Sequence, residues 1–138
     1  MGRINYGPKM FDKKGIVGGV LLGQRYHFGW NHYSLPMEDL SGLSWKSADT
    51  SKMPTFYKGT LDINDETCDT FVRPDSFEKG FVMVNGFNIG IYYNSAGPQE
   101  TLYIPAPILK QGKNEIIVFE SDYCKKPEIE FFDTADLG

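Results

Sequence analysis

The fold class that this sequence predicts is all-β, an antiparallel β-sandwich of jelly-roll type. Short runs of β-branched and aromatic residues recur about every ten residues and end at Gly, Pro, Asn or Asp, a spacing typical of sandwiches and barrels. The composition agrees, because 14% of the residues are aromatic and the chain holds 15 glycines and 8 prolines, which favour strands and turns. No segment shows the apolar period of an amphipathic helix.

The length and charge of the chain set its broad class. With 138 residues, of which 41% are hydrophobic, the chain can bury a core, and we expect one β-sandwich domain over residues 1–138. A net charge of −4 offers no basic patch for nucleic acid or an anionic membrane. No apolar run reaches the roughly 20 residues that span a bilayer. We therefore expect a soluble protein with neither partner.

The N-terminal third is predicted to contain two strands. Met1–Gly7 has the pattern of a strand end running into a turn, which we interpret as the start of a piece excised from a longer protein. The alternative is an intact small protein with an edge strand. Gly15–Gly23 is a glycine-rich apolar run, typical of a strand that another backbone approaches closely. Gln24–Leu35 follows as a second strand, whose alternation places four residues on one face: Tyr26, Phe28, Trp30 and His32.

Residues 36–53 are polar and rich in Ser, Asp and Gly, and we expect a long surface loop there. One helical turn is predicted around Met37–Leu40. Loops of this length are uncommon and are often functional. Trp45 is the conspicuous residue within it.

The rest of the chain is predicted to be a series of strands. Asn85-Gly86 between two β-rich runs predicts a type I′ hairpin, because that turn needs positive φ at both central residues. We expect the three runs within Phe81–Pro105 to form a meander in the middle of a sheet, and one helical turn at Ile108–Gly112. The predicted strands are Thr55–Ile63, Asp69–Val72, Phe81–Val84, Ile89–Tyr93, Thr101–Ile104, Lys113–Glu120 and Ile129–Phe132.

Motifs for catalysis, metal binding or phosphate binding do not stand out. No Gly-x-Ser-x-Gly occurs, and His27 and His32 would lie on opposite faces of one strand. Cys68 and Cys124 are expected to be reduced thiols rather than a disulfide, since a domain of this size does not need one. No cofactor and no metal are expected. The carboxylates at 62–69 predict a solvated acidic turn, with a structural calcium site as the alternative: Asp62, Asp65, Glu66 and Asp69.

Aromatic side chains remain as candidates for a ligand site. Sugars stack their C–H faces on aromatic rings, while polar groups at the rim bind the hydroxyls. Trp45 is the first candidate because it lies on a loop, and Trp30 and Tyr93 are the others. The competing interpretation is that these rings fill the core of the sandwich, as most aromatic side chains in such folds do.

An ordered set of short motifs along nearly the whole chain resembles family 35 of the glycoside hydrolases, the β-galactosidases. Residues 1–7, Met-Gly-Arg-Ile-Asn-Tyr-Gly, are similar to the family's Met-Gly-Arg-x-Asn-Tyr-Gly motif, and residues 12–16 to the Asp-x-Lys-Gly-Ile that follows it. Asn85-Gly86, Gly97-Pro98-Gln99 and Thr101-Leu102-Tyr103 occur in the family's order. One departure lies at Ile91 and Tyr93, where the family usually has Arg and Trp.

The resemblance implies a galactose-binding-like β-domain from the C-terminal region of a retaining β-galactosidase that removes terminal β-linked galactose. In this family the two catalytic glutamates lie on a (β/α)₈ barrel, which takes about 250 residues. The chain is too short to hold that barrel. The implied partner is the barrel of the same polypeptide, and Arg3, Asn5 and Tyr6 are the candidates for the edge that faces it. The compartment of the parent stays open, with a cytoplasmic one favoured.

Three functional hypotheses follow. The first is an accessory domain that packs on the barrel and shapes its substrate entrance. The second is an autonomous carbohydrate-binding module for galactosides. The third is an oligomerisation surface.

Overall fold

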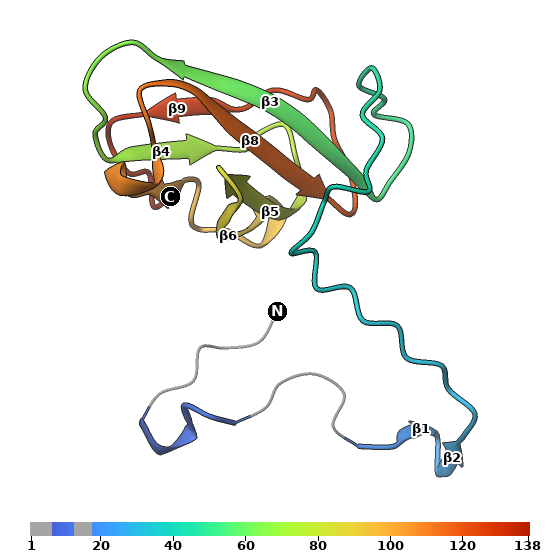
Figure 1. Cartoon of the computed structure of the whole chain (residues 1–138). Helices are drawn as coiled ribbons and strands as arrows, with labels where there is room; N and C mark the ends of the chain where they lie inside the picture. Colours follow the sequence, from blue (N-terminus) through green and yellow to red (C-terminus); the bar gives the residue numbers. More distant parts are fainter. Residues whose placement is uncertain (1–6, 13–17) are drawn as a thin grey trace. The chain divides into compact units, whose positions relative to one another are not determined.

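The computed structural model describes residues 7–12 and 18–138. Contacts divide the chain into two units, 1–37 and 38–138, and each is described by itself. The predicted single domain over 1–138 stays a prediction. The described residues contain no α-helix and hence no helix that could cross a membrane. Three short 3₁₀ helices are present (Figure 1): η1 (Gly7–Lys9), η2 (Asn94–Ala96) and η3 (Ala106–Ile108).

The first unit contains one small antiparallel hairpin. Its strands β1 (Val20–Leu22) and β2 (Arg25–His27) pair Val20 with His27. The predicted strand over Gln24–Leu35 is wrong beyond His27, because residues 28–40 form neither strand nor helix. The indole Nε1 of Trp30 donates a hydrogen bond of 2.9 Å to the carbonyl oxygen of His27. This bond occupies the His27 carbonyl oxygen with a side chain at the end of β2.

The second unit is an antiparallel β-sandwich, and the predicted fold class is confirmed. One sheet has the order β3-β8-β5-β6 and the other the order β7-β4-β9. Their bounds agree with the predicted strands within about two residues, because a run of β-branched and aromatic residues that ends at turn residues marks each one. The strands are β3 (Thr55–Ile63), β4 (Thr70–Arg73), β5 (Lys79–Val84), β6 (Phe87–Tyr93), β7 (Leu102–Ile104), β8 (Gly112–Glu120) and β9 (Glu130–Phe132).

The predicted hairpin at Asn85-Gly86 is confirmed. Asn85 has φ 50° and Gly86 has φ 83°, the positive values that a type I′ turn requires. The side chain of Asn85 holds the turn in place, since its Nδ2 donates to the Ile108 carbonyl at 2.8 Å and its Oδ1 accepts from the Glu115 amide at 3.0 Å.

The predicted meander is wrong in its third strand. β7 does not pair with β6 but crosses to the second sheet, where Tyr103 lies opposite Phe71 of β4. β6 is therefore an edge strand of the four-stranded sheet. The physical reason is burial. Leu102 and Ile104 are 6% and 0% exposed and cover the apolar inner face of the first sheet. Placed beside β6 as a fifth strand of that sheet, β7 would have left this face uncovered.

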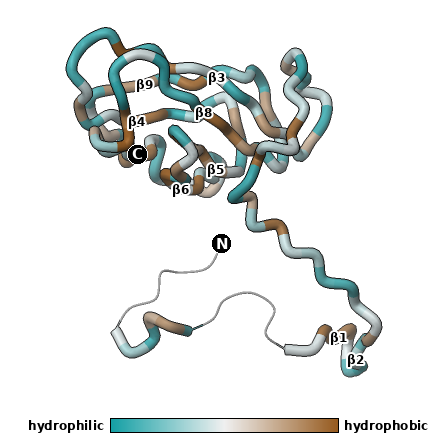
Figure 2. The backbone as a smooth tube through the Cα atoms, in the orientation of Figure 1, coloured by the Kyte–Doolittle hydropathy of each residue, from teal (hydrophilic) through white to brown (hydrophobic). Residues whose placement is uncertain are grey.

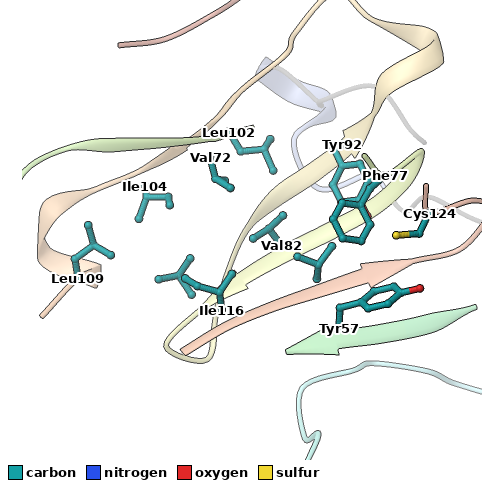
Figure 3. Close-up of a cluster of buried hydrophobic side chains, with 12 residues drawn as sticks. Tyr57, Val72, Phe77, Val82, Tyr92, Leu102, Ile104, Leu109, Ile116 and Cys124 are labelled. Atoms are coloured by element: carbon teal, nitrogen blue, oxygen red, sulfur yellow. The ribbon is translucent and has the colours of Figure 1, made fainter. Parts of the chain in front are cut away.

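The core lies between the two sheets (Figure 3). Val82, Ile116 and Val118 of the first sheet pack with Val72 and Ile104 of the second. Along β8 the chain passes from hydrophilic residues to a hydrophobic run (Figure 2), so that strand supplies much of the inner face. The burial of these side chains is the main source of stability, about 1.5–3 kcal/mol for each large aliphatic side chain.

Residues 38–53 form neither helix nor strand, in agreement with a loop over 36–53. The predicted helical turn at Met37–Leu40 is absent there; instead a turn forms at Ser41-Gly42, where the Asp39 carboxylate accepts a hydrogen bond of 2.9 Å from the Ser41 amide. A short polar side chain that bonds the backbone two residues on favours such a turn over a helix.

Candidate carbohydrate-binding cleft

A cleft of about 650 Å³ runs between the loop and the sandwich in the second unit. Five consecutive residues of β3, Thr55–Gly59, line it. Successive side chains of a strand point to opposite faces, so the cleft follows the backbone edge of β3. The loop contributes Ser44, Trp45, Lys46, Ser47, Ala48, Asp49 and Lys52; the floor is formed by Phe77, Ile116, Val118, Pro127 and Ile129.

Three hydrogen bonds fix the loop side of the cleft. The hydroxyl of Tyr57 donates to the Asp49 carbonyl oxygen at 3.1 Å. The Asp49 carboxylate accepts from the Ser51 hydroxyl at 2.6 Å and from the Ser51 amide at 2.9 Å. These two bonds lower the pKa of Asp49, the hydroxyl contributing most. Asp49 therefore offers the cleft a charged acceptor of fixed orientation at neutral pH.

Trp45 forms one wall with an exposed ring. It is 41% exposed, and the Lys58 ammonium lies 5.2 Å from its ring centroid. Lys58 also pairs with the Glu115 carboxylate on β8. The cation–π contact and the ion pair together orient Trp45 and Lys58, so a partly exposed indole stands beside the Lys58 ammonium. This combination is the chemistry that binds a sugar ring.

The inner end of the cleft is apolar and holds Tyr57, which is 8% exposed. Burial, with the hydrogen bond to the Cys124 thiol, raises the pKa of Tyr57 to about 12. Burial likewise raises the pKa of the Cys124 thiol. In Figure 3 the Tyr57 hydroxyl and the Cys124 sulfur lie at the same end of the core. Both groups are neutral at physiological pH, so the inner end presents no charge to a ligand.

The structure separates the three predicted sugar candidates. Trp45 lines the cleft. Trp30 belongs to the first unit, 57% exposed. Tyr93, at the end of β6, does not line the cleft; the Lys79 ammonium lies 4.9 Å from its ring centroid. Arg3, Asn5 and Tyr6 fall outside the described residues, so their predicted role at a barrel interface stays a prediction.

Sequence reasoning missed Asp49, Lys52 and Phe56 as residues of this cleft. The alternation of Thr55–Ile63 indicated that Phe56 and Tyr57 point to opposite faces. The path of the loop, which brings Asp49 beside β3, depends on a hydrogen bond to Tyr57 eight residues later, and no local pattern predicts it.

The predicted acidic turn does not gather its carboxylates. Among residues 7–12 and 18–138, no group of three or more His, Cys, Asp or Glu side chains is placed to hold a metal ion. Asp69 instead accepts a hydrogen bond of 2.9 Å from the Ala106 amide, which is the main cause of its lowered pKa. It therefore caps the start of η3, a structural role.

The outer face of the four-stranded sheet carries a second feature, a row of apolar side chains that we call the aromatic row: Phe56, Phe119, Phe81 and Ile91. Each member lies directly opposite the next across neighbouring strands. The rings of Phe81 and Phe119 stack at 5.1 Å, and those of Phe56 and Phe119 lie at 4.8 Å. Ile91 is 55% exposed. A partly exposed apolar row on the outside of a sandwich indicates a surface that packs against another body.

Comparisons with known proteins agree with this fold. Residues 54–114 match the family model "Beta-galactosidase, galactose-binding domain", and residues 1–36 match "Beta-galactosidase, first all-beta domain". The class of the chain is thus that of non-catalytic all-β modules found in glycosidases. The chain belongs to the β-galactosidases of glycoside hydrolase family 35.

Three relatives illustrate the similarity. Beta-galactosidase 1 of Dictyostelium discoideum is 46% identical over 129 residues, which cover 87% of this chain and 19% of the relative. Beta-galactosidase-1-like protein 2 of Homo sapiens is 40% identical over 144 residues, which cover 99% of this chain and 22% of the relative. Beta-galactosidase 17 of Arabidopsis thaliana is 39% identical over 139 residues, which cover 87% of this chain and 20% of the relative. The chain thus spans about a fifth of the length of these curated relatives.

Proposed function

We propose that this chain acts as the accessory, non-catalytic β-region of a larger β-galactosidase, packing on the catalytic barrel and shaping its substrate entrance. The parent would hydrolyse terminal β-galactosyl residues with retention. The observation that carries the proposal is the aromatic row, because an isolated sandwich gains nothing by exposing Ile91 beside three half-buried phenylalanines. Family membership supports it, since the relatives are about five times longer.

The proposal is tested by recombining the parts. The chain is mixed with a Dictyostelium β-galactosidase 1 variant that lacks the matching region, and complex formation is followed by size exclusion. Ile91→Asp should abolish the complex by placing a charge in the row. Tyr123→Asp, which alters a side chain 60% exposed outside the row, is the matched control and should leave it intact.

Two results contradict this proposal. One is release of galactose from a β-galactoside by the chain alone, which would mean that it carries a catalytic centre. The other is a complex that tolerates Ile91→Asp as well as Tyr123→Asp.

A second candidate function is galactoside binding in the cleft, favoured by the exposed Trp45 ring beside Asp49 and Lys58. The chain has 2 tryptophans, so Trp30→Phe leaves Trp45 as the sole indole. Titration of this variant with methyl β-galactoside should change its fluorescence saturably, with a dissociation constant between micromolar and millimolar.

Two further variants locate the sugar. Tyr93→Ala should bind unchanged if the cleft is the site, whereas Asp49→Ala should weaken binding about tenfold, the cost of one charged hydrogen bond. If Tyr93→Ala loses galactoside binding and Asp49→Ala keeps it, the sugar binds at β6 and not in the cleft. An absent fluorescence response, with no chemical-shift change, would remove this second function and leave the accessory role.

A further inference from the structure

The edge of β3 is the longest free strand edge of the sandwich. β3 pairs with β8 along its whole length, from Thr55 opposite Glu120 to Ile63 opposite Gly112. On its other side, none of the described residues forms a backbone hydrogen bond to it. In Figure 1 the strand lies at the margin of its sheet, with β8 on one side. A row of unpaired N–H and C=O groups over nine residues is a template for another strand.

The side chains of this edge form two faces. Lys58, Thr60 and Asp62 are exposed on the outer face. On the inner face, Gly59 lies between Tyr57 and Leu61, which pack in and against the core. A Cβ at Gly59 would meet no atom within 4 Å. The inner face of the edge thus has unoccupied space at Gly59, which we call its open place.

Antiparallel pairing of β3 with β3 of a second copy fits these faces in one register. With Thr60 opposite Thr60 on the two-fold axis, Lys58 of each copy lies opposite Asp62 of the other. On the inner face, Leu61 of each copy lies opposite Gly59 and fills its open place. Tyr57 lies opposite Ile63, an aromatic–aliphatic pair. Opposite charges and such apolar pairs are favourable when directly across from each other.

Other registers lose the charge match. With the axis at Gly59, Lys58 lies opposite Thr60; with the axis at Leu61, it lies opposite Asn64. With the axis at Lys58, two ammonium groups face each other. A register slip of one residue exposes the inner side chains of one copy. Asp62 makes no ion pair with a described residue, whereas Lys58 pairs with Glu115 of its own chain. In the register about Thr60 the Lys58 ammonium therefore lies between two carboxylates, Glu115 of its own copy and Asp62 of the other.

We propose that this chain forms a symmetric dimer in which the β3 edges of two copies pair about Thr60, joining the two four-stranded sheets into one. The interface is isologous, since the same edge serves both copies. The proposal is independent of the accessory role. Because the paired strand would occupy the Tyr57–Gly59 side of the cleft, a galactoside bound there and the second copy exclude each other.

Charge reversal across the edge tests the proposal, using the full chain and sedimentation equilibrium at several concentrations. The unmodified chain should show a monomer–dimer equilibrium. Lys58→Asp and Asp62→Lys should each raise the dissociation constant at least about tenfold, because each creates two like-charge pairs per dimer. The double variant Lys58→Asp/Asp62→Lys restores opposite charges and should return the constant to within about threefold of the original.

Lys125→Asp is the control for an exposed lysine away from the edge and should not change the constant. Circular dichroism and thermal melts show whether each variant is folded. Hydrogen exchange adds an independent readout, since amides on the free edge of β3 should gain protection as concentration rises. A chain that is monomeric at every concentration overturns the proposal. So does a dimer that tolerates either single reversal, or a double variant that stays monomeric.

Discussion

The hydroxyl of Tyr92 donates a hydrogen bond of 3.1 Å to the carboxylate of Glu120, which is 0% exposed. No cation pairs with this carboxylate among the described residues. Four backbone amides donate to it instead, at 2.7–3.2 Å: those of Glu78, Lys79, Asp122 and Tyr123. The buried Glu120 carboxylate is therefore satisfied by the Tyr92 hydroxyl and four amides, and these bonds join the ends of β5, β6 and β8.

Replacing this carboxylate should destabilise the sandwich strongly. Glu120→Gln puts an NH₂ group where an oxygen accepts from backbone amides, so buried donors lose their partner at about 1–3 kcal/mol each. We expect the free energy of unfolding, measured by urea denaturation, to fall by about 2–4 kcal/mol. Glu115→Gln removes an ion pair with Lys58, whose side chains are 40% and 42% exposed, and should cost less than about 1 kcal/mol. Similar losses for both variants would contradict this role of Glu120.

Stability should fall at alkaline pH because of buried tyrosines. The pKa of Tyr57 rises from 10.0 to about 12 in the folded chain, and burial, followed by the Glu120 charge, raises that of Tyr92. The unfolded chain therefore loses these protons first, and the stabilisation is present below about pH 10 and lost as pH rises towards 12. For Tyr57 the shift corresponds to roughly 2–3 kcal/mol.

Tyr57→Phe isolates that effect. The variant should lose less free energy of unfolding between pH 9 and pH 11.5 than the unmodified chain does. At pH 7 it should be about 1 kcal/mol less stable, because the hydrogen bond to the Asp49 carbonyl is gone. If the variant and the unmodified chain lose the same free energy of unfolding between pH 9 and pH 11.5, the raised pKa of Tyr57 is contradicted.

Two glycines of the first sheet should respond oppositely to alanine. A Cβ at Gly80 would clash with the carbonyl oxygen of Phe119 on β8, whereas a Cβ at Gly59 would meet nothing within 4 Å. Gly80→Ala should therefore separate β5 from β8 and lower the melting temperature by 10 °C or more, an estimate for a loss above about 3 kcal/mol in a domain of this size. Gly59→Ala should leave it unchanged or raise it slightly. Measurements belong at low concentration, where the β3 edge is unpaired.

The two cysteines should differ in reactivity. Both are free; Cys68 is exposed, and Cys124 is 2% exposed with a pKa raised by burial. A thiol reagent such as Ellman's should modify one thiol quickly, and the second only after denaturant is added. Cys68→Ser should abolish the fast phase. Rapid modification of both thiols would show that the backbone β-bridge between Phe77 and Cys124 opens readily and exposes Cys124.

Local pattern predicted the strands but not their assignment to sheets. Alternation indicated the strand Thr55–Ile63, an apolar run indicated Lys113–Glu120, and turn chemistry indicated the turn at Asn85-Gly86. The crossing of β7 into the second sheet depends on whether β6 or β4 offers the better neighbour, a question of three-dimensional burial. The stretch around Trp30 shows the opposite limit. Four residues alternate there, but no strand pairs with residues 28–40, and alternation alone does not supply a partner.

The candidate site was predicted through one residue. Trp45 stood out as an aromatic residue in a polar loop, and it does line the cleft. Glu120 is one of the residues that match the family, but nothing in the sequence indicated its burial. A carboxylate at a strand end is usually solvated, and its donors at Glu78 and Lys79 lie about forty residues earlier. Tyr93, a candidate by residue type alone, lies at the end of β6 outside the cleft.

The pairing of β3 with β8 has a consequence for synthesis of the chain. Thr55 meets Glu120 only after 65 further residues have been translated, which follows from the register of the two strands. During that interval β3 has no sheet to join, and the apolar run of β5 waits for the same partner. The four-stranded sheet should therefore form late, and the β8 side of Phe81–Val84 stays uncovered until β8 emerges.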